Sequence, residues 1–160
     1  MQIRTATPAD LPEIRKIEAE CFPAAEAAAE QSLADRLAVY PDHFWLLLEN
    51  GAIVAFVNGM ATDEPDLRDE MYADAALHRE TGAWQMIFGV DTVPACRRRG
   101  CAGQLLRHVI AEAKAQGRRG LVLTCKQRLV PYYAKFGFVS EGLSRSAHGN
   151  AEWYQMRLTF

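Results

Sequence analysis

The stretch WQMIFGVDTVPACRRRGCAGQLLRHVIAEAKA, residues 84–115, decides the fold. Its first part, Trp84–Val93, is rich in apolar, aromatic and β-branched residues, which predicts a strand buried within a sheet. Pro94 has no N–H to donate and should end that strand. From Ala102 the apolar residues recur at the spacing of one helix face, and Gly117 suits the position just past a helix end. The stretch therefore predicts a strand, a short loop and a long helix.

The predicted loop between this strand and helix is positively charged and rich in small residues. It contains Arg97, Arg98, Arg99, Gly100, Cys101, Ala102 and Gly103. The first N–H groups of a helix have no partner within it, and the helix dipole makes that end electropositive. Glycine also lets a ligand approach the backbone closely. We therefore expect these residues to bind a dianion such as a pyrophosphate, and we expect Cys101, if exposed, to be the most readily alkylated cysteine.

The loop lacks two common phosphate-binding motifs, since neither G-x-G-x-x-G nor G-x-x-x-x-G-K-S/T occurs. The order Arg97-x-x-Gly100-x-Ala102, directly after a buried strand, resembles the coenzyme A signature Gln/Arg-x-x-Gly-x-Gly/Ala of the GCN5-related N-acetyltransferase (GNAT) superfamily. Residues 130–138, VPYYAKFGF, resemble the short helix and strand that follow in that family. The resemblance covers nearly the whole chain and is closest to the arylalkylamine N-acetyltransferase branch.

The resemblance implies an α/β fold, namely a single-domain GNAT fold with a mixed central sheet of about seven strands flanked by helices. Its parallel fourth and fifth strands are splayed, and the gap between them receives the pantetheine arm of acetyl-CoA, the co-substrate. The cofactor contacts expected on this basis, beside the loop residues above, are Val90, Asp91, Thr92, Thr124 and Tyr133. The N-acetyltransferase domain is expected to span residues 1–160.

Tyr133 matches the tyrosine that serves as general acid in many family members, which transfer the acetyl group directly, without an acyl-enzyme. A phenol is protonated at neutral pH and can donate to the departing thiolate. The alternative is that Tyr132 and Tyr133 form an aromatic pair that closes the core. In the arylalkylamine branch two histidines on the central strand relay the proton of the amine. Met86 and Phe88 stand at those positions here, so the substrates of that branch cannot be carried over.

The acceptor side of the site is expected in residues 24–40 and 61–82. The alanines of the first segment favour helix but bury little, so Glu26, the second candidate catalytic residue, lies where its carboxylate could meet a cationic amine. The alternative is a solvated surface glutamate. Residues 61–82 are acidic, either as a solvated face or as a negative funnel for an amine. The base, if one is needed, is Asp91, Glu26, His78 or water.

The remaining elements follow from hydrophobic spacing and turn signals. Thr7, Pro8 and Asp10 form a capping pattern for a first helix, which Pro23 ends, and Asn50-Gly51 predicts a hairpin. The other expected strands are 3–6, 43–49, 52–60, 120–126, 138–141 and 152–160, and the other expected helices are 11–21, 24–40, 67–77 and 129–136.

Composition and cysteine usage exclude several classes of protein. A net charge of −2 gives no general attraction to nucleic acid or to an anionic membrane surface. No apolar run has the ~20 residues that a membrane span needs, and the N-terminal residues lack the apolar core of a signal peptide. The cysteines show no C-x-x-C spacing and the histidines are scattered, so neither a metal site nor a disulfide framework is expected. A cytoplasmic location fits best.

These features predict an acetyl-CoA-dependent N-acetyltransferase that moves the acetyl group directly to a primary amine of a small molecule. Two alternatives stay open: an acetyltransferase of protein N-termini or lysines, which needs a peptide groove, and a non-catalytic coenzyme A-binding module. The expected partners are acetyl-CoA and a small amine acceptor, with no nucleic acid and no membrane. The chain is expected to be a monomer or a homodimer.

Overall fold

The long central strand expected from the sequence is broken at Phe88 in the computed structural model, which describes residues 1–160. Its two parts are β5 (Trp84–Ile87) and β6 (Gly89–Thr92). Phe88 donates its N–H to the backbone oxygen of Asn58 at 2.7 Å, and Gly89 is paired with the same residue. Phe88 and Gly89 therefore both oppose Asn58 of the neighbouring strand, as in a β-bulge. A β-bulge bends a strand and increases its twist.

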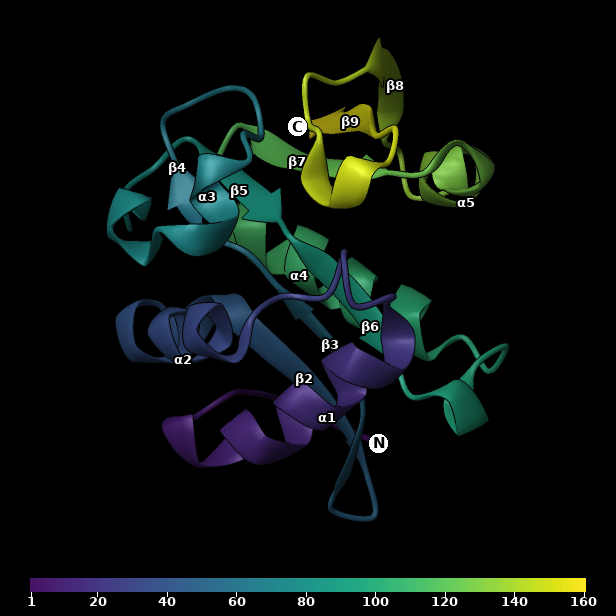
Figure 1. Ribbon diagram of the computed structural model, residues 1–160. Coiled ribbons are helices and arrows are strands. Elements are labelled where there is room, and N and C mark those ends of the chain that lie inside the picture. The colour runs from purple at the N-terminus through teal and green to yellow at the C-terminus, as the bar shows by residue number, and fades with distance from the viewer.

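This break divides nine strands between two sheets (Figure 1). Besides β5 and β6, the strands are β1 (Gln2–Thr5), β2 (Phe44–Glu49), β3 (Ala52–Asn58), β4 (Ala61–Thr62), β7 (Gly120–Cys125), β8 (Val139–Leu143) and β9 (Tyr154–Thr159). The first sheet has the order β1-β2-β3-β6 and is antiparallel throughout. The second has the order β4-β5-β7-β9-β8, in which β5 and β7 are parallel. The mixed α/β fold is confirmed, but the strand count exceeds the expected seven because the central strand breaks and β4 forms separately.

The strands β5 and β7 splay apart as expected. They pair in parallel from Trp84 with Gly120 as far as Ile87 with Leu123. Beyond that point β6 pairs with β3 alone, whereas Thr124 at the end of β7 pairs with β9. One edge of β6 therefore carries backbone N–H and C=O groups with no strand beside them.

Five α-helices cover the sheets, with α1 and α2 on one face of the first sheet and α4 on the other (Figure 1). They are α1 (Leu11–Cys21), α2 (Glu30–Val39), α3 (Glu70–Ala73), α4 (Cys101–Ala115) and α5 (Val130–Ala134). The alternation of side chains along β2 accounts for these layers. Phe44 and Leu46 pack in the core beneath α1 and α2, whereas Trp45 and Leu47 pack beneath α4. The uninterrupted apolar run of β2 is thus a strand buried on both faces.

Two helices are shorter than the sequence predicted. Helix α2 begins at Glu30 rather than at Ala24, because none of residues 24–29 is buried and their alanines have little apolar surface to pack. The helix expected over 67–77 consists of α3 and a separate 3₁₀ turn that follows it. None of the helices is both long enough and apolar enough to cross a membrane.

Candidate active site

A cavity of about 480 Å³ lies between the diverging strands β6 and β7. Among the residues expected in the site, its wall contains Glu26, Val90, Thr124 and Tyr133. Other parts of the wall come from α1, α2, α3, α5 and the loop around His148. Residues 97–103 are not in this wall and form a separate part of the candidate site, where α4 begins.

The loop of residues 97–103 leads into an uncapped helix N-terminus. Gly100 occupies the N-cap with φ +77°, a left-handed backbone that glycine adopts without strain, and a Cβ built there would contact nothing within 4 Å. The N–H of Gln104 donates to the backbone oxygen of Gly100 at 3.0 Å, and no side chain caps the helix. The backbone N–H groups ahead of Gln104 are therefore available to an anion.

The three arginines of this loop are exposed, and two of them are engaged by the chain. Arg97 Nε donates to the backbone oxygen of Thr92 at 3.4 Å, and Arg99 forms an ion pair with Glu49 of β2. The same oxygen of Thr92 also accepts from the thiol of Cys21 at 3.2 Å. The loop thus keeps its positive charge at the surface beside the N-terminus of α4.

Cys101 is buried, so the exposure on which its expected reactivity depends is not met. It is 2% exposed and packs in the largest hydrophobic core cluster. Cys21 and Cys96 are the more accessible cysteines. The backbone N–H of Cys101 nevertheless stands at the first position of α4, followed by Ala102 and Gly103. Any contact of Cys101 with a cofactor would therefore be through its backbone.

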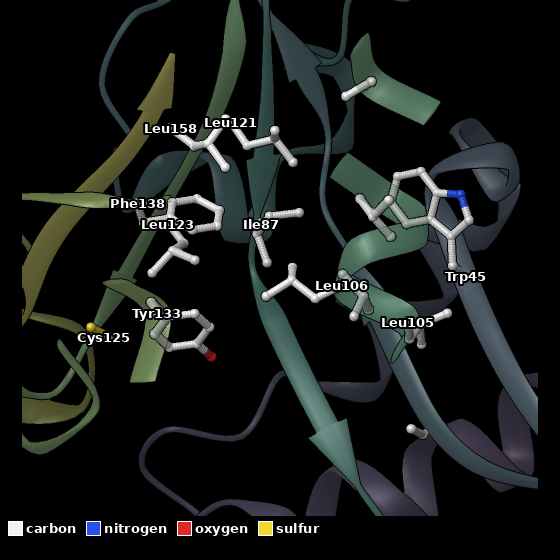
Figure 2. Packing of buried hydrophobic residues seen from close by; sticks show 14 of the residues in the cluster. Trp45, Ile87, Leu105, Leu106, Leu121, Leu123, Cys125, Tyr133, Phe138 and Leu158 are labelled. Atoms are coloured by element: carbon white, nitrogen blue, oxygen red, sulfur yellow. The ribbon is translucent and has the colours of Figure 1, made fainter. Parts of the chain in front are cut away.

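Tyr133 of α5 lines the cavity and also belongs to the largest core cluster. Its ring packs edge-on against Tyr132 and Phe138, with centroids 5.1 and 6.1 Å apart. Figure 2 shows its hydroxyl oxygen directed away from Leu123 and Phe138, toward the β5–β6 strand. Burial raises the pKa of Tyr133, so the phenol keeps its proton at neutral pH. Tyr133 therefore packs in the core with one part of its side chain and lines the cavity with another.

An aromatic wall that the sequence did not indicate lines another part of the cavity; it consists of Tyr72, Phe88, His148 and Trp153. The ring of Tyr72 stacks on His148 at 5.1 Å and lies 4.9 Å from Phe88. His148 in turn lies 6.0 Å from Trp153. The hydroxyl of Tyr72 shares a hydrogen bond of 3.2 Å with Thr124 Oγ1, and burial raises the pKa of Tyr72 to about 12. These residues come from separate segments, so no local pattern could reveal the wall.

Glu26 is not a solvated surface glutamate. Its carboxylate forms an ion pair with Lys126 at 2.8 Å, and its side chain is 10% exposed. Its backbone oxygen lies 2.7 Å from Nε2 of His148. Glu26 therefore lies in the cavity wall as expected, but its charge is already matched by a lysine of the same protein.

The carboxylates of residues 61–82 are bonded within the protein. The ion pairs are Asp63 with Arg79, Glu64 and Glu70 with Arg68, and Asp66 with Arg157. Glu80 forms hydrogen bonds with the rings of His43 and His78. Asp69 accepts from Ser146 and from the N–H of Ala147, and it is the one carboxylate of this segment in the cavity wall. The negative funnel, one of the two alternatives for this segment, has only Asp69 at the cavity and stays a prediction. His78, a candidate base, lies outside the wall.

Asp91 is placed differently from the other expected cofactor contacts. It is 1% exposed, and its carboxyl faces Glu18 of α1, so its side chain is not accessible to a cofactor bound at the edge of β6. Burial, and then the negative charge of Glu18, raise the pKa of Asp91 well above its ordinary value. Arg36 and Asn58 are buried nearby and are joined by a hydrogen bond of 2.9 Å. Glu18, Arg36 and Asn58 were not expected from the sequence.

Known proteins share both the sequence pattern and the fold of this chain. Residues 11–138 match the model of the Acetyltransferase (GNAT) family. Serotonin N-acetyltransferase of Mesocricetus auratus is 29% identical over 145 residues, which are 88% of this chain and 69% of that protein.

Two solved structures illustrate the likeness in fold. The GphF GNAT-like decarboxylase in complex with isobutyryl-CoA has a TM-score of 0.86 at 23% identity, over 99% of each chain. The ribosomal-protein-S18-alanine N-acetyltransferase from Escherichia coli has a TM-score of 0.73 at 20% identity, over 99% of this chain and 92% of that one. With the family match over most of its length, the chain belongs to the GNAT family of acetyltransferases, enzymes that use acetyl-CoA as co-substrate.

Proposed function

We propose that this protein transfers the acetyl group of acetyl-CoA directly to the primary amine of a small molecule. The supporting observation is a bridge between residues 22–29 and residues 145–150, on the acceptor side of the cavity. In this bridge Glu26 bonds to Lys126 through its carboxylate and to His148 through its backbone oxygen. The second segment is also held at its other side, where Asp69 accepts the N–H of Ala147 at 3.0 Å.

A peptide acceptor needs an open groove, because extended chain on one or both sides of the reacting amine must be accommodated. Hydrogen bonds between these two segments would leave less space for such a groove, which supports the small-molecule proposal. The cavity volume of about 480 Å³ lies within the range of small-molecule sites. The ring faces of Tyr72 and Phe88 favour an acceptor that carries an apolar or aromatic body next to its amine.

The splayed edge of β6 and the N-terminus of α4 would hold the cofactor. The amides of pantetheine can pair with the backbone groups of Val90 and with the N–H of Thr92, which have no strand beside them; the oxygen of Thr92 already accepts from Cys21 and Arg97. The pyrophosphate fits at the backbone N–H groups of residues 101–103, beside the three arginines. A backbone N–H near the bulge would bind the thioester oxygen and stabilise its negative charge as the amine attacks.

Tyr133 would act as the acid for the leaving group. Its hydroxyl points toward the β5–β6 strand, where the thioester would lie (Figure 2). Because burial raises the pKa of Tyr133, the phenol has its proton available when the C–S bond breaks. Glu26, in contrast, would shape the acceptor wall rather than react.

The experiment is to measure thiol release from acetyl-CoA by the purified protein with three sets of acceptors, and to identify the acetylated product by mass. The sets are small amines with an aromatic or apolar body, small polar amines, and peptides with a free N-terminus or a lysine. We expect the first set to be acetylated fastest. Peptides acetylated faster than every small amine would overturn the small-molecule proposal. Binding of acetyl-CoA without any acetylated product would favour the coenzyme A-binding module.

A further inference from the structure

Two buried carboxyl groups, Glu18 of α1 and Asp91 of β6, lie together below the bulge at Gly89 and are here called the carboxyl pair. Glu18 is 6% exposed and Asp91 is 1% exposed. No N–H, O–H or S–H donor of another side chain or of the backbone bonds to either carboxyl oxygen of Asp91. Glu18 accepts one bond, from the backbone N–H of Ala28 at 2.9 Å. The pair is thus buried with a single backbone donor.

No cation is bonded to the carboxyl pair. The nearby guanidinium of Arg36 donates instead to Asn58 Oδ1 at 2.9 Å and to the backbone oxygen of Tyr72 at 2.8 Å. Two carboxylates that are buried close together, away from water and without a bonded cation do not both stay ionised, so we infer that the pair holds one proton. The raised pKa of Asp91, caused first by burial and then by Glu18, agrees with this. The other titratable or charged groups that act on Asp91 or Glu18 are Cys21, Arg36 and Tyr133.

Glu18 is the member of the carboxyl pair that is accessible from the cavity, whereas Asp91 lies behind it. Glu18, Gly89 and Asn58 belong to the cavity wall, next to Val90 on the open edge of β6. A Cβ on Gly89 would lie 3.0 Å from Asp91 Oδ1 and 4.0 Å from Glu18 Oε1. Gly89 does not have a positive φ, so space rather than backbone conformation accounts for glycine at this position. The amide nitrogen of Asn58 would also lie 3.3 Å from this Cβ, so the polar groups of Asp91 and Asn58 approach the backbone at Gly89 closely.

We propose that the carboxyl pair is the proton acceptor of the transfer reaction: Glu18 takes a proton from the acceptor ammonium, directly or through one water, and Asp91 positions Glu18 through the shared proton. The inference rests on the proposed function. It gives this chain a base although Met86 and Phe88 stand where the arylalkylamine branch has histidines.

The protons balance in this sequence of steps. The pair goes from one proton to two as R–NH3⁺ becomes R–NH2. The amine nitrogen bonds to the acetyl carbon, and the C–S bond breaks. The thiolate takes the phenolic proton of Tyr133, and the tyrosinate recovers a proton from the new amide nitrogen. The carboxyl pair then releases its second proton to solvent, so that the products are the amide, coenzyme A and one proton.

The decisive experiment is the pH profile of kcat/KM for the best amine, with wild-type protein and the Glu18→Gln variant. Glutamine keeps the volume of the side chain and can still accept the N–H of Ala28. We expect a loss of about 100-fold or more at neutral pH, the size of effect typical of positioned proton transfer. The loss should shrink as the pH approaches the pKa of the amine, because solution then supplies free amine. Glu20→Gln, an exposed position on the same helix, is the matched control and should behave as wild type.

The Asp91→Asn variant tests the positioning role. An asparagine amide can donate to the Glu18 carboxylate as the protonated Asp91 does, so this variant should lose much less activity than Glu18→Gln. Infrared spectroscopy provides a readout without turnover: the band of a protonated carboxyl at neutral pH should disappear in Asp91→Asn. Melting temperature and acetyl-CoA affinity show whether each variant is folded.

The outcomes separate the two proposals. A wild-type protein that acetylates amines, with a Glu18→Gln variant that keeps the same profile or loses activity equally at every pH, would overturn the carboxyl pair as proton acceptor and leave the proposed function intact. A wild-type protein that binds acetyl-CoA and acetylates no amine would overturn both.

Discussion

The Nε2 atom of His148 lies 2.7 Å from the backbone oxygen of Glu26, although the two residues are 122 positions apart in the chain. Because a carbonyl oxygen only accepts, His148 must carry a proton on Nε2. The contact joins the segment after α1 to the loop before β9, and with the stacking of His148 on Tyr72 it closes the acceptor side of the cavity.

Replacing His148 by alanine should weaken binding of the acceptor more than binding of acetyl-CoA. The variant loses a hydrogen bond and an aromatic stack, each worth about 1 kcal/mol, so the KM for the amine should rise roughly 10- to 30-fold. Steady-state kinetics with each substrate varied in turn measures this. His108→Ala, at an exposed position of α4, is the control. Equal effects of the two substitutions on the amine KM would contradict a closing role for His148.

The Tyr133→Phe variant should distinguish a role of Tyr133 as proton donor from a role in core packing alone. The ring and its contacts with Tyr132 and Phe138 remain, but the proton for the thiolate is lost, so kcat should fall by roughly 10²- to 10⁴-fold. Melting temperature and acetyl-CoA affinity should change little. Tyr132→Phe removes a hydroxyl from the neighbouring residue and should keep most of the activity. Full turnover by Tyr133→Phe would leave Tyr133 as a core residue only.

Gly100→Val should abolish the stabilisation that acetyl-CoA confers. Gly100 has φ +77° at the start of α4, and Gly117 has φ +78° just after its end; a Cβ at either would touch nothing. Valine should therefore strain the backbone by the same amount at both positions, about 1–2 kcal/mol. Both variants should lower the melting temperature of the protein without acetyl-CoA. Acetyl-CoA at 100 times its Kd adds about 2.7 kcal/mol to stability. We expect that gain to persist in Gly117→Val and to vanish in Gly100→Val; an equal gain in both variants would place the pyrophosphate elsewhere.

The fold was predictable where the signal is local. The apolar spacing of α4 and the loop before it gave the position of the helix N-terminus, and Asn50-Gly51 gave the hairpin of β2 and β3, with φ of 52° and 81° at the turn. The break at Phe88 was missed, because it arises from pairing with Asn58 of a distant strand. The aromatic wall was missed for the same reason, since Tyr72 meets His148 only in the folded chain.

The positions of Glu18 and Cys101 could have been predicted from the sequence, because each is indicated by the spacing of residues along its helix. Glu18 stands four positions after Ile14, on the apolar face of α1, where a carboxylate is unusual. Cys101 stands four positions before Leu105 and so faces the core, not the ligand. Asp66 of the acidic segment pairs with Arg157, 91 positions away in sequence, so this ion pair could not be anticipated.

Asp91→Asn should stabilise the protein increasingly as the pH rises. The pKa of Asp91 is raised in the folded state above its ordinary value of 3.8, so the folded protein binds more protons than the unfolded chain at any pH between the two values. Stability must then fall as the pH rises through that window, by up to about 1.4 kcal/mol per pH unit. Asparagine is neutral at every pH, so the Asp91→Asn variant avoids this loss of stability. Below about pH 4 the aspartic acid of the wild type is protonated in both the folded and the unfolded protein, so the substitution makes little difference there. The melting temperature of Asp91→Asn should therefore match wild type near pH 4 and exceed it near pH 8.

Asp42→Asn, at an exposed position, should show no such divergence. A constant difference between Asp91→Asn and wild type across this range would mean that Asp91 is ionised in the folded protein, and the shared proton of the carboxyl pair would have to be abandoned.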